Sequence, residues 1–566
     1  MVDRLTVEVI RYAAIYASEE MGVVLRNTAY SPNIKDRLDH TCSVLTPEGL
    51  LAAQAEHIPV HLGSMAVGVK ATMEWLEREG VSLEPGDVVM VNDPYIAGTH
   101  LNDILLVKPV YHRGELVALV ADKAHHVDVG GSVPGSLGGD VRELLQEGIV
   151  IPPVKLVERG RLRREILALI EENVRTPHYF RGDIKAQLAA LNVGEKRILE
   201  LAERYGPKTL LEAWMEILDY TERYTRRRIE ELGRAGSYGA VDYIEVGGEL
   251  LPIRVEVEVR ADGSVRVDFT GTHEQVEAPV NAVYGVTVAA TTFALKSVID
   301  PEMPVNHGFY RVVEILAPEG SLVNPRKPAP VSGGNTETSQ RIADVVFRAL
   351  AEAFPGRVPA ASCGSMTNVA IGGVRGDGSR WAFYETIGCG SGGRPTGDGV
   401  DGVHTNMTNT LNTPVERIEQ EYPLLVVAYS LRGDSEGPGT YRGGLGIRRV
   451  LRLVEGRAIL TILAERCRSR PWGLNGGGPG EPARHYLKRR SGAIIDLGCK
   501  ATVALEEGDE IHINTPGGGG YGDPCKRDPR LIEKDTREAR VSPERAARLY
   551  CYRPGGGAGG VPGTTR

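Results

Sequence analysis

The chain has 566 residues, of which 42% are hydrophobic and 25% are charged, and its formal net charge is -8. This composition is typical of a globular protein with a sizeable core. Because the chain has no excess of positive charge, we expect it not to bind nucleic acid. It contains no run of about 18 apolar residues, so we expect no transmembrane helix and no association with a membrane.

Seven cysteines are scattered along the chain, and no Cys-x-x-Cys pair occurs among them. This odd number and irregular spacing indicate reduced thiols rather than a disulfide framework or a zinc–thiolate site. Charged residues interrupt the apolar N-terminal stretch, which also lacks a small-residue cleavage site, so it does not resemble a signal peptide. We therefore expect a cytoplasmic protein.

The first half of the chain contains the predicted helices. Apolar residues recur at helical spacing over 5–24, which predicts an amphipathic helix, and a second helix is expected over 64–80. Residues 181–232 form a long helical region with densely spaced charges, which is typical of a solvated face. From about residue 239 the pattern becomes strand-like, with a tight turn at 262–263, and only one further helix is predicted, over 338–354.

These patterns predict an α+β fold with several domains. We expect a mixed α/β metal-binding region over 1–235, including the helical segment 181–232, and a β-rich region with glycine-rich loops over 236–545. Residues 546–566 are predicted to be a tail that is partly disordered. The glycine-rich stretch 515–524 lacks the pattern of a phosphate-binding loop, so it favours close backbone packing over anion binding.

The most informative segment is 91–131, where two apolar runs flank four polar residues at 112–115 and predict a β-hairpin. If Tyr111 pairs with Leu116, a regular register places His125 opposite Asn102. In a regular strand Asp103 then points away from His125, and it joins the histidines only if the strand starts late or kinks. The open end of the hairpin gathers imidazole and carboxylate groups: His100, Asp103, His125, His126 and Asp128.

Imidazole and carboxylate groups together favour a divalent transition metal, namely zinc, manganese or iron, over calcium or magnesium. Such an ion could polarise an amide carbonyl or activate water. The alternative interpretation is that these side chains only form hydrogen bonds at the strand ends. A second pair, His57 and His61, flanks Pro59, which argues against one helix containing both histidines. Substrate contact or packing is therefore preferred to metal ligation for this pair.

Several longer stretches carry a resemblance to a known family. They include SPNIKDRLDHTCSV at 31–44, HIPVHLGSM at 57–65, NDPYIAGTHLNDILLVKPV at 92–110, KAHHVDVGGSVPGS at 123–136, PVSGGNTETSQR at 330–341, GDGVDGVHTNMTNTLNTPVERIE at 397–419 and NTPGGGGYGDP at 514–524. With these stretches the chain resembles the hydantoinase B family, which also covers the C-terminal part of 5-oxoprolinase and a large metal-binding subunit of acetone carboxylase. The resemblance extends over almost the whole chain.

The resemblance implies a metal site formed by His100, Asp103 and His125, with Asp39 as a further ligand. His126 and Asp128 are then candidates for a catalytic or supporting role, and His57 and His61 for substrate binding. It also implies a partner, a hydantoinase A-type ATPase that activates the substrate. The chain would be the metal-dependent hydrolytic subunit of a hetero-oligomer that opens a cyclic amide such as a hydantoin, 5-oxoproline or a lactam.

Two alternative functions remain open. One is a subunit of an ATP-dependent ketone carboxylase of the acetone carboxylase type, although that subunit is longer than this chain. The other is a non-catalytic scaffold with a structural metal. A structural site takes all its ligands from protein, whereas a catalytic site keeps an open position, and the predicted ligand set favours the second case.

Overall fold

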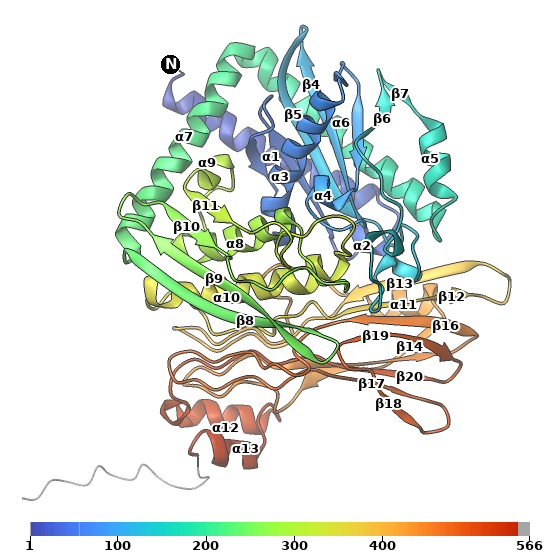
Figure 1. Ribbon diagram of the computed structural model, residues 1–566, viewed down its shortest axis with the longest axis vertical. Coiled ribbons are helices and arrows are strands. Elements are labelled where there is room, and N and C mark those ends of the chain that lie inside the picture. Colours follow the sequence, from blue (N-terminus) through green and yellow to red (C-terminus); the bar gives the residue numbers. More distant parts are fainter. Residues whose placement is uncertain (1, 56, 553–566) are drawn as a thin grey trace, which may run out of the picture.

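The computed structural model describes residues 2–55 and 57–552, and it confirms the predicted α+β class (Figure 1). A seven-stranded sheet occupies the N-terminal part, and its neighbouring strands all run antiparallel. The order across this sheet is β2 (Leu51–Gln54), β1 (His40–Leu45), β5 (Glu115–His125), β4 (Asp103–His112), β3 (Val88–Val91), β6 (Val154–Glu158) and β7 (Arg161–Leu162).

Both faces of this sheet are covered by helices. Leu105 and Val107 of β4 pack in a cluster with residues of α3 (Pro59–Arg78), whereas Ile104 and Leu106 join the larger core that includes α1 (Arg4–Thr28) and α6 (Pro177–Tyr205). Successive residues of a strand point to opposite faces, so a strand buried on both faces is apolar at nearly every position. Burial on both faces therefore explains the two apolar runs from which the hairpin was predicted.

The long helical region predicted over 181–232 is confirmed as helix, but it consists of two helices. Gly206 has φ 81° and ends α6, and Pro207 begins α7 (Pro207–Leu232). A left-handed glycine followed by proline at the first helical position is a common way to end one helix and start another. Shorter helices lie between the strands of this half: α2 (Pro32–Lys35), α4 (Pro94–Ala97) and α5 (Arg164–Glu171).

Between residues 236 and 552 the structure contains three further sheets. The first of them consists of β8 (Gly236–Val246), β9 (Glu249–Val259), β10 (Val265–Asp268) and β11 (Val313–Leu316). The second consists of β12 (Asn368–Val374), β13 (Arg380–Thr386), β16 (Arg457–Leu463) and β19 (Lys500–Glu506). The third consists of β14 (Leu424–Arg432), β15 (Gly446–Leu453), β20 (Glu510–Asn514), β17 (Arg484–Lys488) and β18 (Ile494–Asp496). The predicted turn at 262–263 connects β9 to β10. Figure 1 shows the first sheet (blue) at one end of the molecule and β14 to β20 (orange to red) at the other.

The prediction of only one helix in this half was wrong. Besides α10 (Ser339–Ala353), the structure contains the sixteen-residue α8 (Tyr284–Ile299), which packs between α3 and α10. Helix α8 is apolar on nearly all sides because it is almost entirely buried, so it lacks the one-sided pattern by which helices are predicted. Short helices also occur: α9 (His307–Tyr310), α11 (Val415–Glu421), α12 (Pro529–Arg537) and α13 (Pro543–Leu549).

The glycine-rich stretch 515–524 packs backbone against backbone, as predicted. A Cβ atom on Gly518 would lie 2.0 Å from the carbonyl oxygen of Ser391, and one on Gly517 would lie 1.8 Å from that of Ser435. The Gly518 N–H donates to the Gly444 carbonyl at 2.9 Å. Backbone groups that pair with neighbouring segments in this way are not available to cradle an anion.

The largest core cluster extends from Ile10 to Met407 and therefore includes residues from both sides of position 235. The domain boundary at that position stays a prediction. Within the predicted tail over 546–566, which also stays a prediction, helix α13 continues to Leu549, and Ala546 belongs to one core cluster with Ile532 of α12. The remainder of the predicted tail, from 553 to 566, lies outside the described residues.

Six cysteines form disulfides, which corrects the prediction of reduced thiols. The pairs are Cys363–Cys389, Cys467–Cys499 and Cys525–Cys551, while Cys42 is buried and free. The two cysteines of each pair lie 26 to 32 residues apart and meet only through tertiary folding, so their spacing in the sequence did not indicate that they form disulfides. Among the described residues, no helix is both long and apolar enough to cross a membrane.

Candidate metal centre

The predicted hairpin exists, but its register contains a one-residue shift. Tyr111 pairs with Leu116 as expected, whereas Val110 pairs with Ala118, so the strands pass through a bulge at this point. The shift places His125 opposite Asp103 instead of Asn102. A one-residue change of register moves a side chain to the other face of its strand. Asp103 and His125 therefore lie side by side, and no kink is needed to bring them together.

His100 reaches the same place from the preceding turn. Helix α4 ends at Ala97 and is capped by Gly98, which has φ 83°. After it, the Asp103 N–H donates to the His100 carbonyl at 3.1 Å. This turn folds the His100 ring back over the start of β4. His100 Nε2 lies 3.2 Å from Asp103 Oδ1 and 3.1 Å from His125 Nδ1, and the third distance, between His125 Nδ1 and Asp103 Oδ1, is 3.2 Å.

This triangle of two nitrogens and one oxygen fits a divalent transition metal. Ligand atoms bonded at about 2.0–2.2 Å in a tetrahedral or octahedral shell lie about 2.8–3.6 Å apart. The three observed distances fall inside that range, and all three residues are at most 2% exposed. Three atoms with lone pairs that face one another in a buried site are the donor set that zinc, manganese or iron would take.

The charges of this cluster support one another. Burial alone disfavours an ionised Asp103, but His100 and His61 lower the pKa of its carboxyl well below the usual value. Burial likewise disfavours a charged His100, yet Asp103 and Asp39 raise its pKa. For His125 burial dominates and lowers the pKa. The surroundings therefore favour an ionised Asp103 and a neutral His125, which are the forms that bind a metal, while the raised pKa of His100 means that a metal would have to displace a proton more readily held there.

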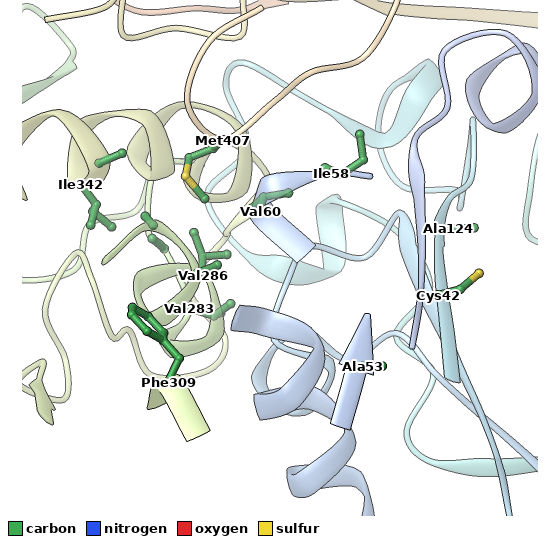
Figure 2. Packing of buried hydrophobic residues seen from close by; sticks show 14 of the residues in the cluster. Cys42, Ala53, Ile58, Val60, Ala124, Val283, Val286, Phe309, Ile342 and Met407 are labelled. Carbon is green, nitrogen blue, oxygen red and sulfur yellow. The ribbon is translucent and has the colours of Figure 1, made fainter. Parts of the chain in front are cut away.

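A small cavity of about 20 Å³ opens onto the triangle. This volume is enough for an ion or one water molecule, but not for a ring-shaped substrate. Its walls include Asp39, His61 and Val60 from the N-terminal part, together with residues from far along the chain: Asn335, Thr336, Met366, Tyr384, Thr386, Met407 and Thr408. Figure 2 shows Met407 beside Val60, and the Val60 N–H donates to the Met407 carbonyl at 3.1 Å.

Tyr384 holds His125 in place from the other side. The two rings stack with centroids 4.9 Å apart, and the Arg37 guanidinium lies 4.8 Å from the centroid of the Tyr384 ring. The Tyr384 hydroxyl donates to Asn368 Oδ1 at 2.7 Å, and the Asn368 amide donates to Glu337 Oε1 at 2.8 Å. A chain of contacts of this kind fixes the orientation of a ligand ring.

Two of the predicted residues lie at the edge of the triangle. His61 Nε2 is 3.2 Å from Asp103 Oδ2, so His61 contacts the carboxylate oxygen that faces away from the other histidines. Pro59 lies between His57 and His61 in the sequence, and it begins helix α3, so His61 lies in the first turn of that helix and His57 precedes it. The Asp39 carbonyl accepts a hydrogen bond from the His125 N–H at 3.0 Å, which continues the pairing of β1 with β5. Asp39 lines the cavity, but its carboxylate does not belong to the triangle.

The structure places three other candidates away from the cavity. His57 lies 3.4 Å from Glu19 and beside His40. His126 bonds to Gln187 Oε1 at 3.0 Å, and its ring packs against Phe180. The Asp128 carboxylate accepts hydrogen bonds from Gly130, Gly135 and Arg175 and so holds the loop after the hairpin.

The cavity walls from residues 335–408 were missed as site residues. The stretches 330–341 and 397–419 stood out only through their family resemblance, and nothing in their local pattern indicated that they face the hairpin. In the structure, a π-helical turn over Gly334–Thr338, a distortion that often marks a functional site, leads directly into α10 beside these walls.

The sequence profile described as Hydantoinase B/oxoprolinase matches residues 3–524. The chain belongs to the hydantoinase B/oxoprolinase family. It is 56% identical over 548 residues to an uncharacterized protein of Methanocaldococcus jannaschii, with 97% of this chain and 96% of the relative covered. It is 32% identical to a Pseudomonas protein named as one subunit of a putative D-/L-hydantoinase, at 97% and 95% coverage.

Identity to 5-oxoprolinase 1 of Arabidopsis thaliana is 36%, where the match covers 92% of this chain but only 42% of the relative. Among solved structures, the ATP-dependent caprolactamase of Pseudomonas jessenii superposes with a TM-score of 0.90 at 30% identity, covering 97% of this chain and 96% of that one. Acetone carboxylase superposes with a TM-score of 0.91 at 20% identity, with 97% and 79% covered, and so shares the fold.

Proposed function

We propose that this chain is the metal-dependent hydrolytic subunit of an ATP-dependent enzyme that opens cyclic amides. The observation that carries the proposal is the buried triangle of His100, Asp103 and His125 at the wall of a cavity. Membership of the hydantoinase B/oxoprolinase family and the likeness to a caprolactamase support a cyclic amide as the substrate.

His100, Asp103 and His125 would hold the ion, and His61 orients Asp103 through its second oxygen. When bound, a zinc, manganese or iron ion supplies a Lewis acid that polarises a carbonyl or activates water. In the part of the chain that the structure describes, the Asp39 carboxylate forms no side-chain hydrogen bond. It is therefore free to complete the ligand set or to accept a proton from water in the cavity.

In this conformation the cavity has room for only an ion or one water molecule, so its walls would have to separate before a substrate can bind. The mobile contact would be the one between Val60 and Met407, because it joins segments that are far apart in the sequence. Closure over a bound substrate would exclude bulk water from the reaction.

We infer that a hydantoinase A-type ATPase activates the substrate and that the two chains form a hetero-oligomer. The sequence contains no phosphate-binding loop, and the glycine-rich stretch that most resembles one uses its N–H groups for backbone pairing. One relative is named as a subunit of a hydantoinase, and another as an ATP-dependent caprolactamase. The 5-oxoprolinase relatives are more than twice as long as the region that they share with this chain.

The first experiment is elemental analysis of the purified chain, with His125→Ala as the test variant. His126→Ala is the matched control for metal content, because His126 is the next residue and is equally buried but points toward Gln187. We expect zinc, manganese or iron near one equivalent in the wild type and in His126→Ala, and its loss in His125→Ala. A wild-type chain that cannot be loaded with any of these metals would refute the proposal.

The second experiment combines the chain with an ATPase partner and tests hydantoin, 5-oxoproline and caprolactam. We expect an ATP-dependent, ring-opened amino acid or carbamoyl acid, and loss of this product with His100→Ala while the ATPase keeps part of its activity. Formation of a β-keto acid from a ketone and bicarbonate would instead assign the chain to the carboxylases.

A further inference from the structure

A second cluster of possible metal ligands lies in the C-terminal sheets and shares no residue with the cavity. Cys467 follows β16, His485 lies on β17, and Cys499 immediately precedes β19. One possible ligand atom from each of these residues lies within 4.8 Å of the other two. Three segments that are distant in the sequence thus bring two sulfur atoms and an imidazole to one place.

His485 is the unusual member of this cluster. Its side chain is 2% exposed, and neither ring nitrogen has a hydrogen-bond partner among the described residues. Ala483, just before the strand, and Leu487, two residues further along it, belong to an apolar core cluster. A buried imidazole without partners is unfavourable, because it gives up hydrogen bonds to water and receives none in return.

Backbone hydrogen bonds hold the three residues in position independently of the sulfur atoms. The Ala464 N–H donates to the Cys499 carbonyl at 2.8 Å, and the Leu497 N–H donates to the His485 carbonyl at 3.0 Å. The Cys467 N–H donates to the Glu245 carboxylate at 3.2 Å. Cleavage of the Cys467–Cys499 disulfide would therefore leave both thiols next to the imidazole.

We propose that Cys467, His485 and Cys499 form a second metal site, which binds zinc or a similar thiophilic divalent cation when the disulfide is reduced. Two thiolates and one imidazole are three of the four ligands of a tetrahedral zinc site, and a water molecule can complete it because Cys467 is only half-buried. His485 would then gain the partner that it lacks in the disulfide form.

The two forms of this site exclude each other. An external dithiol opens the Cys467–Cys499 bond by thiol–disulfide exchange, gives up two electrons and becomes a disulfide itself. The two thiols that result lose one proton each when the cation binds. The other disulfides offer no such site, because neither Cys363–Cys389 nor Cys525–Cys551 belongs to a group of three possible ligands among the described residues.

Cobalt(II) is a suitable probe, because thiolate ligands give a near-ultraviolet charge-transfer band that the nitrogen and oxygen ligands of the hairpin cannot give. The full chain is stripped of metal, reduced with a phosphine and titrated with cobalt(II). We expect one equivalent to produce the band in the reduced wild type, and none in the oxidised protein. The band should disappear in the Cys467→Ser/Cys499→Ser double variant, and the affinity should fall more than about tenfold in His485→Leu.

Cys525→Ser/Cys551→Ser is the matched control, because it removes a disulfide that has no histidine beside it, and it should keep the band. Should a variant fail to fold, the wild type gives a second test. Zinc should protect Cys467 and Cys499, but not Cys525 and Cys551, from alkylation mapped by peptide mass spectrometry. A reduced wild type without the band, a band that survives in Cys467→Ser/Cys499→Ser, or alkylation that zinc leaves unchanged would overturn the proposal.

Discussion

Replacing Asp103 with asparagine should remove the metal from the hairpin site while leaving the fold intact. Asparagine has nearly the same shape, so the packing around the triangle changes little. It carries no charge, however, and Asp103 is the only acidic member of the triangle. The variant thus tests whether the charge of this carboxylate, rather than its volume, holds the ion.

The expected loss follows from the burial of the pair. A carboxylate oxygen about 2.1 Å from a divalent ion gains about 16 kcal/mol of Coulomb attraction at an effective dielectric constant of about 20. Desolvation of the ion and of Asp103, which is 1% exposed, offsets most of this gain. Removing one partner of a buried charge pair costs about 3–5 kcal/mol, which corresponds to a loss of affinity of more than about 100-fold.

The assay is competition with a chromophoric chelator, and Asp122→Asn is the control. Asp122 lies on β5 in the same sheet and is also fully buried, but burial raises the pKa of its carboxyl well above the usual value and so favours its neutral form. Its hydrogen bond from Gln187 can be accepted by an amide oxygen equally well. We expect Asp122→Asn to bind metal like the wild type. Equal affinities for Asp103→Asn and Asp122→Asn would refute the assignment of Asp103 as a ligand.

Three further predictions concern the surroundings of the site and the C-terminal half. Tyr384→Phe keeps the stacking on His125 but loses the hydrogen bond from the hydroxyl to Asn368. The metal affinity measured by calorimetry should therefore fall about tenfold. An unchanged affinity would show that this chain of contacts does not position His125. Gly518→Ala forces a Cβ atom to within 2.0 Å of the Ser391 carbonyl oxygen, so the free energy of unfolding should fall by about 3 kcal/mol in thermal unfolding. Gly239→Ala is the control: its Cβ atom would meet only a carbonyl oxygen at 3.9 Å, so it should change the stability little. Burial raises the pKa of Glu337 to about 8, whereas the same carboxyl in the unfolded chain loses its proton near pH 4.5. Between these two values only the folded chain holds the proton, so this residue lowers the stability of the fold increasingly as the pH rises from about 4.5 to about 8. Glu337→Gln should therefore raise the melting temperature at pH 8 relative to the wild type but not at pH 5, and a gain of equal size at both would contradict the protonation argument.

The sequence was most informative where a local pattern decides the structure. The turn at 112–115 and the two apolar runs predicted the hairpin, and the hairpin brought His100 and His125 to one end. The bulge between Val110 and Tyr111 was not predictable, because both strands are apolar on both faces and a register slip leaves no trace in such a pattern. That slip decides whether Asp103 faces the histidines.

Other features depend on contacts between distant segments. Helix α8 is buried on nearly all sides, so it has no polar face to reveal its period. The disulfide partners and the far wall of the cavity come together only in the folded chain. Tyr384 reaches His125 across more than 250 positions, and the residue types along β13 give no hint of this contact.

The cavity walls from residues 335–408 also bear on how the protein is made. The hairpin leaves the ribosome long before Thr336, Tyr384 and Met407 do, so during synthesis the His100–Asp103–His125 triangle exists without its covering wall. A nascent chain that folds its N-terminal sheet early would present these ligands to the surrounding solution. The choice of metal would then depend on when the second half folds over the site, and not only on the affinity of the finished protein.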